Sequence, residues 1–497
     1  MIEAALDGMA MLLSVKSIVL MLVGIVVGLV FGALPGLSGQ TALAVLLPFT
    51  LGMDPAAAMS LLLGAHVAVE FGGSVSAILI NTPGTGQAIA TCWDGYPMAQ
   101  RGEAARALSI AATSSAVGGL VGFAVLVACI PIMKRTLMAI ASPEYFLAAF
   151  VGLTFIVVLG GGSLIKALIS GGLGLMLAFV GLDPITSVPR FTFGQLSLWD
   201  GISLVPIVVG LFALPEVAAL LAKGESIARI ELHGSQWGLI WQGIKDTFSH
   251  WWVLLQCSAL GVFIGILPGL GGTVANLAAY GLAARTSPER DTFGQGAIDG
   301  ILAPESANNS KEGGDLIPTI ALGIPGGAGM AILLGAFVMV GLTPGPEMLT
   351  TGLSHTFAIA WILAIANLLT TAIGLLCCAP IARLCFLPVQ ILAPAIMAVC
   401  LVGAYLDGGQ IENVFLAVGF GLFGYLMRRT GYPRAPMIIG VVLGRIVERY
   451  LHMALKLYGR LFFLRPISLC LLAVVIVTMA APALYARTMR ANAGAGR

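Results

Sequence analysis

The sequence predicts an all-α polytopic membrane protein, and its composition and apolar runs carry that prediction. Charged residues make up 10% of the 497 residues and the mean hydropathy is +1.00, whereas soluble proteins carry about 25% charged residues. Uncharged runs of roughly 20 residues, the length that spans the hydrocarbon core, recur along the chain. Together with shorter apolar runs they predict about 10–12 transmembrane helices. A soluble chain of this composition could not cover its apolar surface.

The long uncharged runs mark the expected helices in chain order. They cover residues 17–53, 107–133, 145–165, 247–284, 316–346, 348–382, 384–406 and 466–486. Two shorter runs, 167–182 and 201–215, fit tilted spans, half-helices or pieces packed inside the membrane. The first run follows Lys16 and is too long for a signal peptide, so we expect an uncleaved first span.

The most polar stretch between apolar blocks, residues 223–246, divides the chain. We therefore expect a first membrane repeat at residues 15–222, an inter-repeat linker at 223–246 and a second membrane repeat at 247–465. A terminal transmembrane span at 466–486 and a basic tail at 487–497 complete the predicted organisation. Basic residues gather on both sides of that terminal span. The positive-inside rule cannot place both groups in the cytoplasm, so the orientation is left open.

A glycine-proline motif occurs once in each half. The first copy, residues 32–39, reads GALPGLSG, and the second, residues 265–272, reads GILPGLGG. Each copy ends a long apolar run and is followed by a further Pro-Gly break, at residues 83–84 and 325–326. A tandem repeat of one fold accounts for this correspondence better than chance.

The matched breaks predict a substrate or ion site. Proline removes a backbone donor, and glycine adopts conformations closed to other residues. Inside a bilayer such irregular backbone is tolerated only where it is buried or lines a cavity. Broken helices also expose their ends, which attract anions at the amino terminus and cations at the carbonyl terminus. One Pro-Gly pair favours a packing kink, but matched breaks in two halves favour the permease of a transporter.

Glycines and small polar residues surround the breaks and form the predicted site. Neutral amides and hydroxyls can bind a carboxylate or replace the hydration shell of sodium without a permanent buried charge. Helix–helix hydrogen bonding is the alternative role of each polar residue. We expect Asn81 to meet the pair Asn308 and Asn309 near the middle of the membrane. The predicted substrate and ion residues are Gly36, Ser38, Gln40, Thr41, Asn81, Thr82, Gly84, Thr85, Gly269, Thr273, Asn276, Asn308, Asn309 and Gly326.

Ionisable residues inside apolar surroundings are further candidates. His66 and Glu70 are four residues apart and share a helix face, so they could pair, relay a proton or line the path. They are the predicted residues for ion or proton coupling, although Glu70 could instead mark the end of a span. Glu305, Lys311 and Glu312 lie in a more polar stretch, which favours a solvated loop for Lys311.

Other function classes lack a pattern that would support them. The eight cysteines form no CxxC pair and have no histidine at zinc spacing, so we expect structural roles and no metal site other than one for sodium. No nucleophile with a base, paired aspartates or metal-binding motif supports an intramembrane enzyme. A scaffold that moves no cargo would not need matched polar breaks. A net charge of +2 gives no sign of a nucleic-acid partner.

Several motifs together resemble those of a known transporter family. The resembling segments lie at residues 32–41, 72–85, 94–99, 192–194, 210–216, 265–272, 303–309, 316–318 and 322–326. The most diagnostic of them, 303–309, reads APESANN. On these segments the chain resembles the TctA-type large permease subunits of the tripartite tricarboxylate transporters. It departs from the family pattern at residues 310–312, where small neutral residues are usual, and around residues 70–71, where the usual aromatic residue is shifted.

The resemblance implies a large permease subunit of a binding-protein-dependent secondary transporter, multi-pass in the bacterial cytoplasmic (inner) membrane. It implies two inverted repeats with re-entrant hairpins, and import of a tricarboxylate or related carboxylate on a cation gradient. Sodium is the expected coupling ion, with no other cofactor. The expected partners are a small membrane subunit similar to TctB and a periplasmic solute-binding protein similar to TctC. The alternative is a stand-alone secondary carboxylate transporter without a binding protein.

Overall fold

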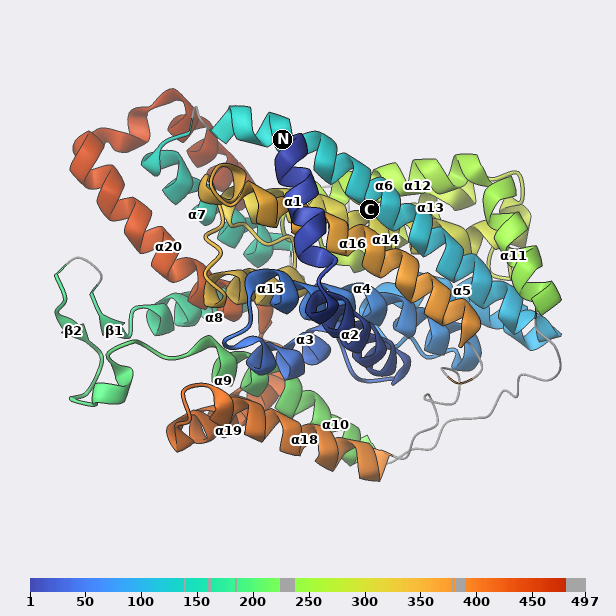
Figure 1. Cartoon of the computed structure of the whole chain (residues 1–497), viewed down its shortest axis with the longest axis horizontal. Helices are drawn as coiled ribbons and strands as arrows, with labels where there is room; N and C mark the ends of the chain where they lie inside the picture. The colour runs from blue at the N-terminus through green and yellow to red at the C-terminus, as the bar shows by residue number, and fades with distance from the viewer. Residues whose placement is uncertain are drawn as a thin grey trace, which may run out of the picture.

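The computed structural model describes residues 1–137, 140–159, 163–183, 186–223, 237–377, 380 and 389–479. Over these residues the chain is almost entirely helical (Figure 1). The described strands are β1 (Gly181–Leu182) and β2 (Pro189–Arg190), a short antiparallel hairpin with Gly181 opposite Arg190. The predicted all-α polytopic fold is therefore confirmed.

The helices follow the apolar runs of the sequence. Up to residue 223 they are α1 (Ile2–Leu12), α2 (Val15–Ala33), α3 (Gly39–Leu46), η1 (Leu47–Thr50), α4 (Pro55–Ile80), η2 (Gly86–Ala88), α5 (Ile89–Met98), η3 (Ala99–Glu103), α6 (Ala104–Leu137), α7 (Ser142–Leu159), α8 (Leu164–Ala178), η4 (Leu196–Leu198), α9 (Leu204–Val208), η5 (Val209–Ala213) and α10 (Leu214–Lys223). From residue 237 onward they are α11 (Trp237–Ser249), α12 (Trp251–Ile266), α13 (Gly271–Thr286), η6 (Arg290–Thr292), α14 (Ile298–Leu322), α15 (Ala328–Met339), η7 (Glu347–Leu349), α16 (Leu353–Leu376), α18 (Val389–Leu406), α19 (Ile411–Thr430), α20 (Ala435–Tyr458) and η8 (Gly459–Leu464).

Fewer of the described helices qualify as membrane spans by length and composition than the apolar runs predict. Among the described residues, six are long and apolar enough, and two sharply bent helix pairs raise the number to eight. The bent pairs are α11 with α12, at 74°, and Ala435–Leu464 with Pro466–Met479, at 68°. The expected number of about 10–12 is higher because every apolar run, including the shorter ones, was counted toward a span. Some of that length forms short helices, at Gly39–Thr50, Leu164–Ala178, Ala328–Met339 and Gln390–Leu406.

The two halves of the chain are interlocked. Helix α6 packs along α14, α16 and α11, and α20 packs on α7 and α8. Figure 1 shows α2, α3, α4 and α15 near the centre of the molecule. The predicted division into a first repeat, a linker and a second repeat stays a prediction. Helix α11 occupies the end of the predicted linker, while residues 224–236 and 480–497 lie outside the described residues, as do Cys378 and Cys385.

The two copies of the glycine-proline motif break the helices as predicted. Helix α2 gives way to α3 across the first copy, and α12 gives way to α13 across the second. Gly36 has a φ of +93° and Gly269 a φ of +85°. A side chain is disfavoured in this region because its Cβ approaches the neighbouring carbonyl oxygen. The motif therefore contains glycine where the backbone turns.

The second breaks end α4 and α14 in the same conformation. Asn81 follows α4 with a φ of +52°, and Gly323 follows α14 with a φ of +68°. The N–H of Gly269 donates a hydrogen bond of 2.9 Å to the carbonyl of Gly326. This bond joins the two breaks of the second half and satisfies backbone groups that the interrupted helices leave free.

Glycines also bring matching helix pairs into close contact. A Cβ on Gly32 would collide with the carbonyl oxygen of Val69, so α2 lies directly against the backbone of α4. A Cβ on Gly265 would collide with the carbonyl oxygen of Lys311, which places α12 against α14 in the same way. Small residues are what allow membrane helices to approach this closely. The correspondence is compatible with two repeats, whose homology and inversion stay predictions.

Alanine at Gly36 or Gly269 should destabilise the folded protein. An L-residue in the left-handed region costs roughly 1–2 kcal/mol, so each variant should show a lower thermal midpoint in detergent than the parent. The matched control is Gly281→Ala in α13, where an added Cβ meets no atom within 4 Å. It should leave the midpoint unchanged or slightly higher. Equal midpoints for all three variants would contradict the backbone role of the motif.

Candidate functional site

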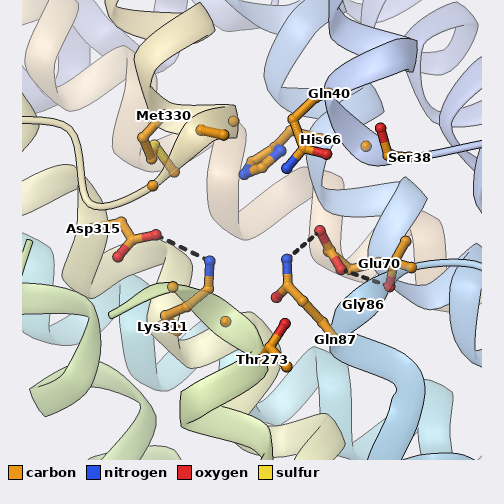
Figure 2. A pocket seen from close by; sticks show the side chains of 17 residues that line it. Ser38, Gln40, His66, Glu70, Gly86, Gln87, Thr273, Lys311, Asp315 and Met330 are labelled. Carbon is orange, nitrogen blue, oxygen red and sulfur yellow. Dashed lines mark hydrogen bonds and ion pairs between the residues drawn. The ribbon is translucent and has the colours of Figure 1, made fainter. Parts of the chain in front are cut away.

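A partly open cavity lies where the broken helices of the two halves converge. Its volume is about 280 Å³. Its walls come from the first turns of α3, α13 and α15, from the middle of α4 and α14, and from η2 (Figure 2). Elements from both halves of the chain therefore build one site.

Three helices begin at this cavity. Gly39 is the first residue of α3, Gly271 of α13 and Ala328 of α15, and all three residues line the cavity. The first turn of a helix has backbone N–H groups without intrahelical partners, and the helix dipole adds partial positive charge there. These helix ends therefore make one side of the cavity attractive to an anion.

Charged side chains of α4 and α14 form a buried network beside the cavity. His66 Nε2 lies 2.6 Å from Glu312 Oε2. Lys311 Nζ lies 2.6 Å from Glu312 Oε1 and 3.0 Å from Asp315 Oδ2. Since each charge has an opposite partner, the network can be buried.

The expectation that Lys311 lies in a solvated loop is wrong. Lys311 is 4% exposed and belongs to α14, a continuous helix of 25 residues. The polar stretch is not a loop because its charged groups find partners on their own helix and on α4. The charged residues of this stretch belong to a buried network and are not exposed to water.

Glu70 differs from Glu312 and Asp315 because neutral groups bind it. Gln87 Nε2 donates to Oε1 at 2.7 Å, and Thr85 Oγ1 donates to Oε2 at 3.3 Å. Glu70 lies inside α4 and is 2% exposed, so it does not mark the end of a span. His66 binds Glu312 and not Glu70 among the described contacts, although both residues face the cavity.

Glycines make room for these side chains. A Cβ on Gly272 would collide with Gln87 Oε1, and a Cβ on Gly326 would collide with Asp315 Oδ1. Some glycines of the breaks thus turn the backbone, and others receive polar side chains from other elements. The pairs of this kind are Gly272 with Gln87, Gly326 with Asp315 and Gly329 with His66.

The structure brings part of the predicted site together at the cavity. Predicted residues that line it are Ser38, Gln40, His66, Glu70, Thr85 and Thr273. Predicted residues outside its lining are Gly36, Thr41, Asn81, Thr82, Gly84, Gly269, Asn276, Asn308, Asn309 and Gly326. Whether the predicted residues bind cargo stays a prediction.

Several of the predicted residues outside the lining hold in place the elements that form the cavity. Thr41 and Ser38 form a capping box at the start of α3. Asn276 donates to the backbone carbonyl of Gln87 at 2.8 Å and so holds η2 in place. Gly84 packs against the backbone of Gly32, where a Cβ would collide with the carbonyl oxygen. These contacts orient the elements that carry the cavity's side chains.

The expected meeting of the asparagines does not take the form of a hydrogen bond. Asn309 Nδ2 donates to Asn367 Oδ1 on α16 at 2.6 Å, which is the helix–helix role. Asn81 ends α4 and is exposed. Among the described residues no hydrogen bond joins Asn81 to Asn308 or Asn309. Both side-chain polar atoms of Asn308 are buried without a hydrogen-bond partner.

Sequence reasoning missed Gln87, Asp315 and the inward position of Lys311. A signal was present for two of them. Lys311 and Asp315 are four residues apart with opposite charges, the spacing of an ion pair on one helix face. Gln87 carries no such signal because its partner, Glu70, is distant in sequence and reaches it through the break after α4.

Other motif residues hold the surrounding helices. Glu305 accepts hydrogen bonds from Ser74, Thr91 and Ser115, at 2.5, 2.5 and 3.1 Å, and so ties α14 to α4, α5 and α6. Asp94 accepts the backbone N–H groups of residues 296 and 297, both at 2.8 Å, just before α14. Both acidic residues therefore anchor α14.

The fold and the site define a class of protein. Broken helices that enclose a polar cavity inside a polytopic helical protein are the architecture of a transporter permease. The family model described as "Tripartite tricarboxylate transporter TctA family" matches residues 18–439. The chain belongs to this family, which is a transporter family and not an enzyme family.

Two proteins of Agrobacterium vitis are similar to the chain. One is 34% identical over 461 residues, covering 92% of this chain and 91% of its own length, and is described as an uncharacterized 52.8 kDa protein in the TAR-I ttuC' 3'region. The other is 33% identical over 220 residues, covering 44% of this chain and 91% of its own length, and is described as an uncharacterized protein in the TAR-II ttuC' 3'region. No solved structure matches the chain.

Gly326→Ala should disturb the buried network, whereas its neighbour should tolerate the same change. The added methyl group would displace the Asp315 carboxylate from Lys311, at a cost of about 1–3 kcal/mol. At Gly327 an added Cβ meets no atom within 4 Å, and its φ of −166° is open to any residue. The thermal midpoint of Gly326→Ala should fall below that of Gly327→Ala. The reverse order would contradict the contact.

The amides of Asn309 and Asn367 should act as a unit. If their hydrogen bond joins α14 to α16, the two single alanine variants and the double variant should be non-additive in stability. A coupling energy of about 0.6 kcal/mol is typical of such bonds in membranes. Unfolding free energies measured in mixed micelles would provide the cycle. Fully additive effects would assign Asn309 a role other than this bond.

Proposed function

We propose that the chain is the large permease subunit of a binding-protein-dependent secondary transporter that imports a tricarboxylate or a related carboxylate. The observation that carries this proposal is the cavity at which α3, α13 and α15 begin. Free N–H groups at helix ends suit a carboxylate, since they donate hydrogen bonds without a fixed counter-charge. Membership of the TctA family supports the class of cargo.

Polar side chains near these helix ends would orient the cargo. Gln40 and Thr273 lie in the first turns of α3 and α13, and both line the cavity. Their amide and hydroxyl groups can donate to carboxylate oxygens or accept from a hydroxyl. Because these groups are neutral, they would bind a charged cargo without holding it too tightly for release.

A cation gradient would drive the import, and sodium is the expected ion. The carboxylates of Glu70, Glu312 and Asp315 stand beside the cavity with Lys311 and His66 as basic partners. With the carboxylates ionised, these fixed charges do not sum to a positive value. An anion that enters such a buried site therefore requires a cation alongside it.

In this proposal the permease works in the bacterial inner membrane with two partners. One is a small membrane subunit, and the other is a periplasmic solute-binding protein that delivers the carboxylate. The family's place in tripartite transporters supports both partners. The matching breaks at Gly36 and Gly269 support inverted repeats that expose the cavity to each side of the membrane in turn.

Reconstitution tests the proposal directly. Proteoliposomes that contain the chain and the membrane subunit encoded beside it should accumulate labelled citrate, tartrate, malate or succinate on an inward sodium gradient. Accumulation should require the cognate binding protein and should fall at least tenfold without the sodium gradient. Empty liposomes provide the background. Accumulation that is equal without the binding protein would establish a stand-alone carrier, and no uptake of any of these carboxylates would refute the proposal.

A further inference from the structure

His66 has an unused nitrogen at the wall of the cavity. The residue is 5% exposed and lines the cavity from α4. Nε2 lies 2.6 Å from Glu312, whereas Nδ1 is buried without a hydrogen-bond partner. A buried polar atom without a partner is costly, so its position requires an explanation. Figure 2 shows the imidazole ring at the edge of the central space.

The contact with Glu312 defines the state of that free nitrogen. Glu312 Oε1 also forms an ion pair with Lys311 Nζ at 2.6 Å, so the carboxylate is paired with both neighbours. Because a carboxylate only accepts, His66 Nε2 must carry the hydrogen of that bond. In the neutral ring Nδ1 then carries a lone pair directed at the cavity wall, which is a site for a proton.

The surrounding charges can accommodate a proton on His66. Glu312 and Asp315 face it from α14, and Glu70 lies one turn further along α4. Lys311 is the cation that opposes it, and this side chain is already bound between Glu312 and Asp315. The first turn of α15 covers the ring with Gly329, which carries no charge. Three carboxylates thus face one lysine, and an imidazolium would reduce the surplus of negative charge.

The buried acidic residues Glu305, Asp94 and Asp299 lie outside the cavity lining and have partners. Glu305 accepts from three hydroxyl groups, and Asp94 accepts from two backbone N–H groups and from Tyr280. Asp299 is bonded to His250 and Ser287 outside the cavity lining. Their carboxylates are held by these partners, whereas His66 lines the cavity and its Nδ1 has no hydrogen-bond partner.

We propose that His66 Nδ1 is a proton-binding site and that one proton enters with the cargo. A proton from the outer solution adds to Nδ1, forming an imidazolium whose charge Glu312 offsets. The new N–H group then donates to the carboxylate of the cargo in the cavity. When the cavity opens to the other side, cargo and proton leave together, and Nδ1 regains its lone pair. This inference rests on the proposed permease function and adds a proton to the coupling cation.

The test separates cargo movement from proton movement. Proteoliposomes of the full complex are first assayed for counterflow of labelled citrate, tartrate, malate or succinate at equal pH and sodium on both sides. The exchanged carboxylate is then supplied with an inward proton gradient at equal sodium, while an internal dye reports acidification. The parent should accumulate the carboxylate and acidify the lumen. In His66→Gln, which preserves a hydrogen-bonding group but binds no proton, both responses should be at least tenfold smaller when each is divided by the variant's own rate of counterflow.

The test includes a matched control, and two of its possible results would overturn the proposal. His355→Gln on α16, away from the cavity lining, should behave as the parent. If His66→Gln still accumulates carboxylate on the proton gradient and acidifies the lumen, the proton travels on the cargo and the proposal is overturned. Counterflow by the parent without any response to the proton gradient would also overturn it and leave the permease function standing. Absence of counterflow by the parent would refute the permease function.

Histidine nitrogen spectroscopy supplies a readout that needs no cargo. In ¹⁵N-histidine spectra of the full complex, one signal that is missing from His66→Gln should come from a ring with hydrogen on Nε2 alone. That signal should change to the doubly protonated form between about pH 8 and about pH 5. If every histidine signal of the full complex keeps one protonation state over this range, the proposal is overturned even if His66→Gln fails to fold.

Discussion

The contact of backbone against backbone between α2 and α4, and between α12 and α14, is the constraint on which the rest of the structure depends. Gly32 and Gly265 have no Cβ, and a Cβ at either position would hold these helices apart. Because the helices touch, the breaks that follow them lie close to the middle of α4 and α14. The first turns of α3 and α13 therefore open onto polar side chains that those buried helices carry.

Electrostatics then decides what the buried helices can hold. Lys311 is tolerated inside the protein because Glu312 and Asp315 lie within 3.0 Å of its ammonium group. Glu312 in turn reaches His66 on α4, so one chain of charges crosses from the second half to the first. Each of these groups would be costly alone, and their mutual pairing makes burial possible. The cavity is thus polar without a surplus of positive charge, a condition that links the entry of an anion to the entry of a cation.

Much of the fold was predictable because the bilayer requires long apolar helices and restricts where they can break. The breaks at Gly36 and Gly269, and six residues of the cavity lining, were predicted from proline, glycine and small polar neighbours. The number of spans was less predictable, since apolar length does not distinguish a crossing helix from a short one that ends inside the protein. Asn309 shows the same limit. Its amide could bind cargo or another helix, and only packing against α16 placed it beside Asn367.

The sequence by itself determined the class of fold and the positions of the broken helices, because apolar length and the backbone limits of glycine and proline act locally. The tertiary structure decided which polar groups share one site. Gln87 reaches Glu70 only after the chain reverses beyond α4, and Lys311 is buried only because α14 packs beside α4 and α12. These contacts join residues far apart in the chain, and their free energy depends on partners that local sequence does not reveal. From sequence alone a charged residue is therefore expected to be exposed. Only the structure shows the opposite charges that allow its burial, as it does for Lys311.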